Sequence, residues 1–172
     1  SVVGGDEFGR RLIDGLISVG VDCRHVRRMP DTPTGLCFVT LDADGERRFT
    51  HRGGHPFSDF GLADVEAMDL SNFGLLHFGC GALRNPQTSD AIRHIIDQSS
   101  ALVTCDPGCS PPAWGPPKEV HQRVIDVIPY CQIFKCSLSD AHRIFGEYGP
   151  DEILHRLTDY GVPLSIVTDG HR

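Results

Sequence analysis

The sequence has 172 residues, of which 40% are hydrophobic and 23% are charged, and its formal net charge at pH 7 is −7. This balance is typical of a globular chain, and the negative charge argues against a nucleic-acid partner, which would need clustered lysine and arginine. No apolar run approaches the ~20 residues that a membrane-spanning helix needs.

The first elements predicted along the chain are a helix and a hairpin. Apolar residues recur at helical spacing from Phe8 to Ile17, and Gly20 is placed to end that helix. Segments 35–41 and 46–52 then flank Asp42-Ala-Asp-Gly45, in which the glycine can supply a positive φ. This pattern predicts an antiparallel hairpin.

After Pro56, short apolar strands alternate with helices. Strands are expected at 75–78, 101–105, 132–135 and 164–168, and helices at 62–70 and after Asn85, Pro116, Ser137 and Pro150. This alternation is typical of βαβ units, which form a parallel sheet covered by helices on both faces. Because an antiparallel hairpin does not readily join such a sheet, we expect residues 34–52 to form a small flap or lid within a single domain.

The cysteine pattern favours free thiols. The chain has seven cysteines, an odd number, and no Cys-x-x-Cys motif. We therefore expect buried thiols in the reducing cytoplasm. His51 and His55 have no third ligand at a suitable spacing, so a structural zinc site is not expected.

The carboxyl ends of the predicted strands are the expected ligand site, because parallel α/β sheets bind ligands there. Polar or glycine-rich loops follow four consecutive strands, at Gly79-Cys-Gly81, 106–114, 135–140 and 168–170. Neither Gly-x-x-x-x-Gly-Lys-Ser/Thr nor Gly-x-Gly-x-x-Gly occurs, which excludes the P-loop and Rossmann phosphate cradles. His77, in the middle of a strand, is predicted to be a hydrogen-bonded core histidine.

The order of several short motifs is informative as a set. Val3-Gly-Gly-Asp-Glu-Phe-Gly9, Gly20-Val-Asp22 and Thr34-Gly35 lead to the hairpin, and Leu76-His-Phe-Gly79, Val103-Thr-Cys-Asp-Pro107, Phe134-Lys135 and Ile166-Val-Thr-x-Gly170 follow it. Over essentially the whole chain, this order resembles the ribokinase (PfkB) family of carbohydrate kinases, and especially its fructokinase and 2-keto-3-deoxygluconate kinase branch.

The resemblance implies a fold, a reaction and a set of site residues. The fold is a three-layer α/β/α sandwich with a mostly parallel sheet and a small β-hairpin lid. The reaction is transfer of the ATP γ-phosphoryl group to a sugar hydroxyl, with Mg²⁺, in a cytoplasmic protein that can form a homodimer through the lid. The implied residues are His51 and Arg52 for the sugar, Ser137, Thr168, Asp169 and Gly170 for the nucleotide, Asp106, Gly108 and Ser110 as the phosphate-loop equivalent, and Asp140 for the metal through water.

The resemblance also implies that functional parts of the family lie outside residues 1–172. A Gly-Gly-x-x-x-Asn sugar-binding segment is expected before Ser1, and a Gly-Ala-Gly-Asp motif with the catalytic aspartate is expected after Arg172. We therefore expect residues 1–172 to form a single domain that is incomplete at both ends, has no catalytic residue of its own, and is inactive alone. Where the family often has Asp-Pro-Asn-x-Arg, this chain has Asp106-Pro-Gly-Cys-Ser110, so the charged fork of the arginine is missing.

These departures leave a second hypothesis open: a degenerate, non-catalytic module of the same fold that binds a sugar or a nucleotide or serves as an interaction module. Individual residues also have structural alternatives. Ser137 and Asp140 match a capping box, Thr168-Asp-Gly170 matches an ordinary turn at a strand end, and His51-Arg52 matches an exposed polar strand end.

Overall fold

The computed structural model describes residues 1–43, 45, 47–52, 60–108 and 117–170, with side chains for all of them except residues 80 and 117–120. The chain divides into two compact units, Ser1–Phe60 and Gly61–Arg172, called unit 1 and unit 2 below. Unit 1 contains two two-stranded sheets, and unit 2 contains one four-stranded sheet.

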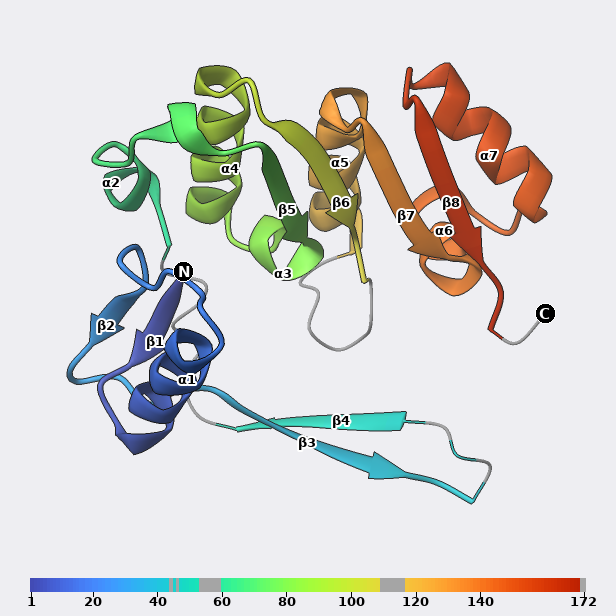
Figure 1. The fold of residues 1–172 in the computed structure, drawn as a ribbon. Coiled ribbons are helices and arrows are strands. Elements are labelled where there is room, and N and C mark those ends of the chain that lie inside the picture. Colours follow the sequence, from blue (N-terminus) through green and yellow to red (C-terminus); the bar gives the residue numbers. More distant parts are fainter. Residues whose placement is uncertain (44, 46, 53–59, 109–116, 171–172) are drawn as a thin grey trace. The chain divides into compact units, whose positions relative to one another are not determined.

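Unit 1 begins with two short parallel strands and a helix. β1 (Val2–Gly4) pairs with β2 (Arg27–Met29), and α1 (Glu7–Ser18) comes between them in the sequence (Figure 1). The predicted helix is confirmed, and Gly20 follows it with a positive φ of 85°. The sequence pattern predicts neither strand, because three residues are too few to show an alternation.

Asp6 ties the start of α1 to the segment before the hairpin. Its Oδ1 accepts hydrogen bonds from the backbone N–H of Gly9 at 2.9 Å and from Thr34 Oγ1 at 2.6 Å, and its Oδ2 accepts one from the Thr34 N–H at 2.9 Å. Thr34 Oγ1 in turn accepts a hydrogen bond from the Gly4 N–H at 3.1 Å. The Thr34 hydroxyl is the largest cause of a lowered pKa of Asp6, because hydrogen bonds to a carboxylate favour its charged form.

Unit 1 is therefore expected to lose stability in acid. The pKa of Asp6 lies below its ordinary value of 3.8, and Arg10 and Arg11 lower the pKa of Glu7 from 4.5 to about 2. Carboxylates with a lowered pKa stabilise the fold above their unfolded pKa, and this contribution is lost as the pH falls from about 4 through the folded values. Urea unfolding at several pH values should show a shallower acid dependence for Asp6→Asn than for the unchanged chain.

The exposed Asp31 offers a matched control for this prediction. Asp31→Asn makes the same chemical change outside the hydrogen-bonded network, so its acid dependence should equal that of the unchanged chain. An Asp6→Asn curve parallel to that of the unchanged chain would show that Asp6 does not cause the acid sensitivity.

The predicted hairpin is confirmed as an antiparallel pair with its own sheet. β3 (Leu36–Leu41) pairs with β4 (Arg47–Arg52), from Leu36 opposite Arg52 to Leu41 opposite Arg47. Gly45 in the connection has a φ of 79°, as its place in the turn predicts. Four large apolar side chains of these strands are exposed, namely Phe38, Val39, Leu41 and Phe49, and Leu36 is half-buried.

Unit 2 contains the parallel sheet, in the order β5-β6-β7-β8, with every neighbouring pair parallel (Figure 1). The strands are β5 (Leu75–Gly79), β6 (Leu102–Asp106), β7 (Ile133–Ser137) and β8 (Leu164–Thr168). The helices are α2 (Leu62–Val65), α3 (Cys80–Leu83), α4 (Pro86–Gln98), α5 (Pro117–Val127), α6 (Leu138–Phe145) and α7 (Pro150–Asp159). The predicted alternation of strands and helices is confirmed.

The helix boundaries of unit 2 follow local chemistry. Asn85 caps α4 by accepting a hydrogen bond from the Gln87 N–H at 2.9 Å. The helix predicted over 62–70 is shorter, since α2 ends at Val65. Asp69 accepts hydrogen bonds from the N–H and hydroxyl of Ser71 and starts a separate 3-10 helix, Leu70–Asn72. A second 3-10 helix, Ile128–Tyr130, follows α5. Over the described residues, every helix is too short or too polar to cross a bilayer.

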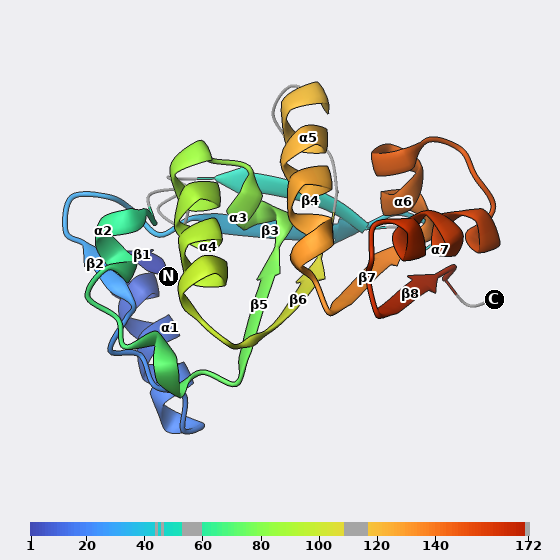
Figure 2. The ribbon, with the colours of Figure 1, turned by 90° about the horizontal axis from the view of Figure 1, so that it is seen from above.

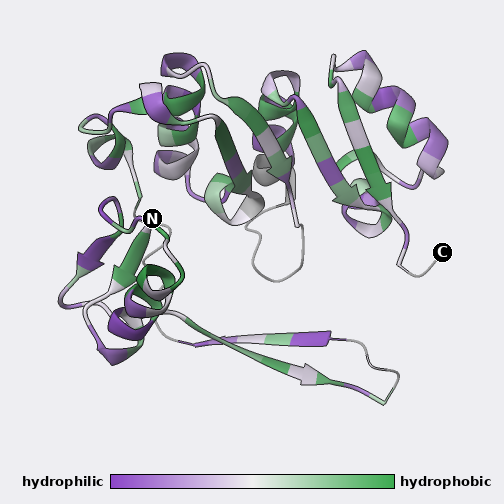
Figure 3. Cartoon of the chain, in the orientation of Figure 1, coloured by the Kyte–Doolittle hydropathy of each residue, from purple (hydrophilic) through white to green (hydrophobic). Residues whose placement is uncertain are grey.

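The core of unit 2 lies between the sheet and one layer of helices (Figure 2). Alternate strand residues, such as Phe78, Val103 and Phe134, pack with apolar residues of α3 to α7, and the strands are largely hydrophobic along their length (Figure 3). The other face carries exposed apolar side chains, among them Leu75 and Leu164. The described residues of unit 2 thus provide one of the two predicted helical layers.

Candidate functional site

The carboxyl ends of the four parallel strands lie at one edge of the sheet. The strand register places Gly79 beside Asp106 and Ser137 beside Thr168. The structure therefore brings the ends of all four predicted strands together at the edge where parallel α/β sheets bind ligands.

The face of the sheet away from the core, called the open face below, changes character toward this edge. Side chains alternate between the two faces of a strand, so every second residue belongs to the open face. Its residues are Leu75 and His77 on β5, Leu102, Thr104 and Asp106 on β6, Ile133, Lys135 and Ser137 on β7, and Leu164, Ile166 and Thr168 on β8. All of these residues are exposed or half-buried except Thr104, which is buried. The open face is apolar near the amino ends of the strands and mainly polar near their carboxyl ends.

An ion pair joins two neighbouring strands on the open face. Lys135 Nζ lies 2.9 Å from Asp106 Oδ2, and the two side chains are 39% and 36% exposed. An ion pair this exposed contributes at most about 1 kcal/mol to folding, because water screens it. Lys135 belongs to the polar segment 135–140 that the sequence predicts at this edge, but the sequence analysis gives it no specific role, although it is one of only two lysines in the chain.

His77 differs from its prediction. It forms the expected hydrogen bond, since its Nδ1 lies 2.7 Å from Thr104 Oγ1. However, its side chain is exposed on the open face and is not in the core. The prediction of a core position was wrong because the apolar neighbours Leu76 and Phe78 belong to the opposite face of the same strand.

Ser137 and Asp140 form the capping box that their spacing predicts. Ser137 Oγ accepts a hydrogen bond from the Asp140 N–H at 3.1 Å, and Asp140 Oδ2 accepts one from Ser137 Oγ at 2.5 Å. Arg143 Nη1 lies 3.6 Å from the other carboxylate oxygen, Oδ1. The capping role, which the sequence offers as the structural alternative for Ser137 and Asp140, is therefore observed.

These contacts decide how a metal ion could fit. The side chain of Asp140 is only 10% exposed, and the described part of the chain has no group of three or more His, Cys, Asp or Glu residues arranged to hold a metal. The described residues thus contain no cluster of protein side chains for a metal, and the role of Asp140 through water stays a prediction.

The remaining predicted nucleotide and phosphate residues lie at the same edge. Thr168 ends β8, and its Oγ1 lies 3.5 Å from the carbonyl oxygen of Cys136. Gly170 and Gly108 follow β8 and β6 with positive φ values of 57° and 47°, so both positions suit glycine. Ser110 lies outside the described residues.

The predicted sugar residues belong to unit 1. His51 and Arg52 end β4, where His51 is partly buried opposite Cys37 and Arg52 is exposed. Arg52 Nη1 donates a hydrogen bond to the carbonyl oxygen of His51 at 3.0 Å. These two residues lie together at the end of the hairpin.

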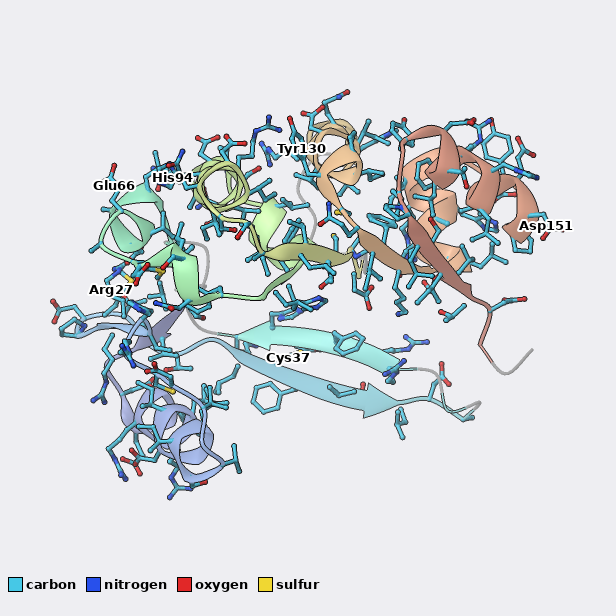
Figure 4. The ribbon with its side chains drawn as sticks, turned by 45° about the horizontal axis from the view of Figure 1, so that its top comes forward. Arg27, Cys37, Glu66, His94, Tyr130 and Asp151 are labelled. Carbon is cyan, nitrogen blue, oxygen red and sulfur yellow. The ribbon has the colours of Figure 1, made fainter. Side chains whose placement is uncertain are left out.

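A cavity of about 650 Å³ lies on the helical side of unit 2, away from the predicted site residues. It is lined by residues of α4, of the second half of α5 and of the following 3-10 helix, and by Tyr160 at the end of α7. The guanidinium carbon of Arg93 lies 5.3 Å from the ring centroid of Tyr130, which Figure 4 labels. No sequence signal predicts this cavity, because its lining comes from separate helices.

The five cysteines whose side chains are described are free thiols, and Cys105, Cys131 and Cys136 are buried. Burial raises the pKa of the Cys136 thiol to about 12, and the carboxylates of Asp140 and Asp106 act in the same direction. Since the thiolate is the reactive form, iodoacetamide should label the exposed Cys37 (Figure 4) in the native protein and leave Cys136 unlabelled until denaturation. Peptide mapping by mass spectrometry would measure this order, and native labelling of Cys136 would contradict it.

The fold and the candidate site define an α/β protein with a parallel sheet, whose carboxyl edge is polar, and a β-hairpin with its own sheet. The model of the pfkB family of carbohydrate kinases matches residues 1–172, and the chain belongs to this family.

Similar proteins agree with this membership. The chain is 28% identical to a probable fructokinase-7 of Arabidopsis thaliana over 98% of its own length and 51% of that protein, and 27% identical to a 2-dehydro-3-deoxygluconokinase of Thermoproteus tenax over 93% and 50%. The structure of a Vibrio cholerae fructokinase bound to fructose, ADP and calcium superposes with a TM-score of 0.84 at 26% identity, over 98% of this chain and 56% of that one. The chain spans about half the length of the curated relatives it matches.

Proposed function

We propose that the whole protein transfers the γ-phosphoryl group of ATP to a hydroxyl group of a sugar. The observation that carries this proposal is the match of the carbohydrate kinase family over residues 1–172. The likeness to a fructokinase bound to fructose and ADP supports the same two substrates.

The carboxyl edge of the sheet is proposed as the nucleotide side of the site. Ser137, Thr168, Asp169 and Gly170 are assigned to the nucleotide, and the segment Asp106–Ser110 to its phosphates. The polar strand ends and the exposed backbone near Gly170 suit a phosphate-bearing ligand, because backbone N–H groups and hydroxyls can donate hydrogen bonds to it.

Phosphoryl transfer depends mainly on positioning and on electrostatic stabilisation. Residues 1–172 would orient the two substrates, and the base that accepts the hydroxyl proton is assigned to the family motif expected after Arg172. Mg²⁺ would enter with ATP and neutralise charge on its phosphates, and Asp140 would accept a hydrogen bond from a water of the ion.

The hairpin 34–52 is proposed as the lid of the sugar site, with His51 and Arg52 in contact with the sugar. Its exposed apolar side chains also suit a homodimer contact through the lid, since large exposed apolar patches mark interaction surfaces. Free thiols in the described part of the chain are consistent with a cytoplasmic location.

An ADP-release assay on the whole protein tests the proposal. Fructose, 2-keto-3-deoxygluconate and ribose are offered separately with MgATP, and at least one of them should raise ADP release well above the rate without sugar. A correctly folded whole protein, verified by circular dichroism, that turns over none of these sugars would favour the non-catalytic binding module.

A further inference from the structure

A polar cluster on the open face, formed by Asp106, Lys135, His77 and Thr104, contains hydrogen-bond donors and acceptors that are not all used in contacts within the described protein. Asp106 Oδ2 holds Lys135, which occupies one of the three N–H groups of the ammonium. Among the described residues, Asp106 Oδ1 and the other two N–H groups of Lys135 have no protein partner. An acceptor and two donors thus lie side by side near the carboxyl edge.

This combination matches the chemistry of a sugar hydroxyl. A hydroxyl group both donates and accepts a hydrogen bond, so a carboxylate and an ammonium together can satisfy neighbouring hydroxyls. His77 extends the polar cluster along β5. Thr104 is buried and supports the His77 ring, since its Oγ1 lies 2.7 Å from His77 Nδ1 and donates a hydrogen bond to the Leu76 carbonyl oxygen at 3.5 Å. Ile166, beside Lys135 in the register, and Ile133, beside Thr104, add apolar surface for the C–H groups of a sugar ring.

The charge of the cluster indicates which sugars it can take. Asp106 and Lys135 carry opposite charges 2.9 Å apart, so the pair is neutral as a whole. An anionic sugar would gain attraction from Lys135 and lose a comparable amount to repulsion from Asp106, whereas a neutral sugar meets only hydrogen-bonding groups.

We propose that Asp106 and Lys135, supported by His77 and Thr104, form a hydroxyl-binding subsite that selects an uncharged sugar over a sugar acid or a sugar phosphate. This inference rests on the proposed function, because it names the substrate class of the proposed kinase. It assigns the Asp106 side chain, which the resemblance places in the phosphate-loop equivalent, to the sugar instead. It also adds Lys135, His77 and Thr104, to which the sequence gives no sugar-binding role.

Two substitutions should change the preference between anionic sugars and fructose in opposite directions. Asp106→Asn leaves Lys135 without its counter-charge, so the affinity for anionic sugars relative to fructose should rise about tenfold. Lys135→Met leaves the carboxylate unpaired, so the same ratio should fall by about the same factor, and both variants should bind fructose more weakly than the unchanged protein. A purely structural role of the pair would weaken all sugars alike.

A matched control is available outside the site. Glu152 pairs with Arg156 on the exposed surface of α7, with Glu152 Oε1 and Arg156 Nη2 3.3 Å apart. Glu152→Gln removes one carboxylate from an ion pair, as Asp106→Asn does, and should change neither the affinity for any sugar nor the preference among sugars.

The closing experiment measures binding and turnover separately on the whole protein and its variants. Binding of fructose, 2-keto-3-deoxygluconate and fructose 6-phosphate is followed by calorimetric titration, and ADP release is measured with the same three compounds. The expected result is preferential binding of fructose, with opposite shifts in the two site variants and none in the control.

The outcomes separate the two proposals. ADP release with an anionic acceptor in preference to fructose would overturn the neutral-sugar subsite and leave the kinase proposal standing. Fructose binding with the predicted shifts, but without ADP release on any sugar, would overturn the kinase proposal and leave the subsite standing. No detectable fructose binding, or equal losses for all sugars in both site variants, would overturn the subsite.

Discussion

Replacing Phe134 by alanine should destabilise unit 2 by about 3–5 kcal/mol. Phe134 is the second residue of β7, is 0% exposed, and is the largest fully buried side chain among the described residues of the apolar cluster between the sheet and the helices. The substitution removes the ring from a close-packed core and leaves a cavity that the rigid strands around it can only partly fill. Urea unfolding followed by far-ultraviolet circular dichroism would measure the loss.

Phe73 provides the matched control, because it lies in the same unit and is 46% exposed. Phe73→Ala makes the same chemical change where little packing is lost, so it should cost about 1 kcal/mol or less. Similar losses of unfolding free energy for the two variants would contradict the buried position of Phe134.

The second large effect is expected at Gly9, in the first turn of α1. A Cβ atom at this position would overlap sterically with the carbonyl oxygen of Gly4 and would lie 2.9 Å from Thr34 Oγ1. Both neighbours belong to the network around Asp6, so they cannot move without breaking its hydrogen bonds. Gly9→Ala should therefore destabilise unit 1 by about 2–3 kcal/mol, measured by thermal or urea unfolding.

Gly15, in the same helix, should respond in the opposite direction. No atom lies within 4 Å of a Cβ built at Gly15. Alanine is favoured over glycine inside a helix, so Gly15→Ala should stabilise unit 1 by about 0.5–1 kcal/mol. A stabilising effect of Gly9→Ala as well would contradict the close contact between α1 and Gly4.

Local patterns in the sequence predict much of the secondary structure. The hairpin follows from two alternating segments around Asp-Gly, and α4, α6 and α7 follow from Asn85, Ser137 and Pro150 at their starts. These signals depend on residues close together in the chain, so they can be recognised without knowing the tertiary fold.

Features that depend on distant segments could not be predicted in this way. The apolar stripe of α1 predicts a helix, yet Phe8, Leu12 and Ile17 are exposed, because amphipathicity does not say what covers a face. Likewise, the pairing of Asp106 with Lys135 depends on the register of two strands that are 29 residues apart in the sequence. The exposed position of His77 depends on which face of the sheet the helices cover.

The central claim is that the whole protein moves a phosphoryl group from ATP to a sugar hydroxyl. Phosphorus-31 magnetic resonance of the whole protein with MgATP and fructose tests it most directly, because it distinguishes phosphoryl transfer from ATP hydrolysis. The expected result is the growth of a sugar phosphate monoester signal in step with the loss of the γ-phosphate signal of ATP. Unchanged ATP, or ATP converted only to ADP and inorganic phosphate, would contradict the claim.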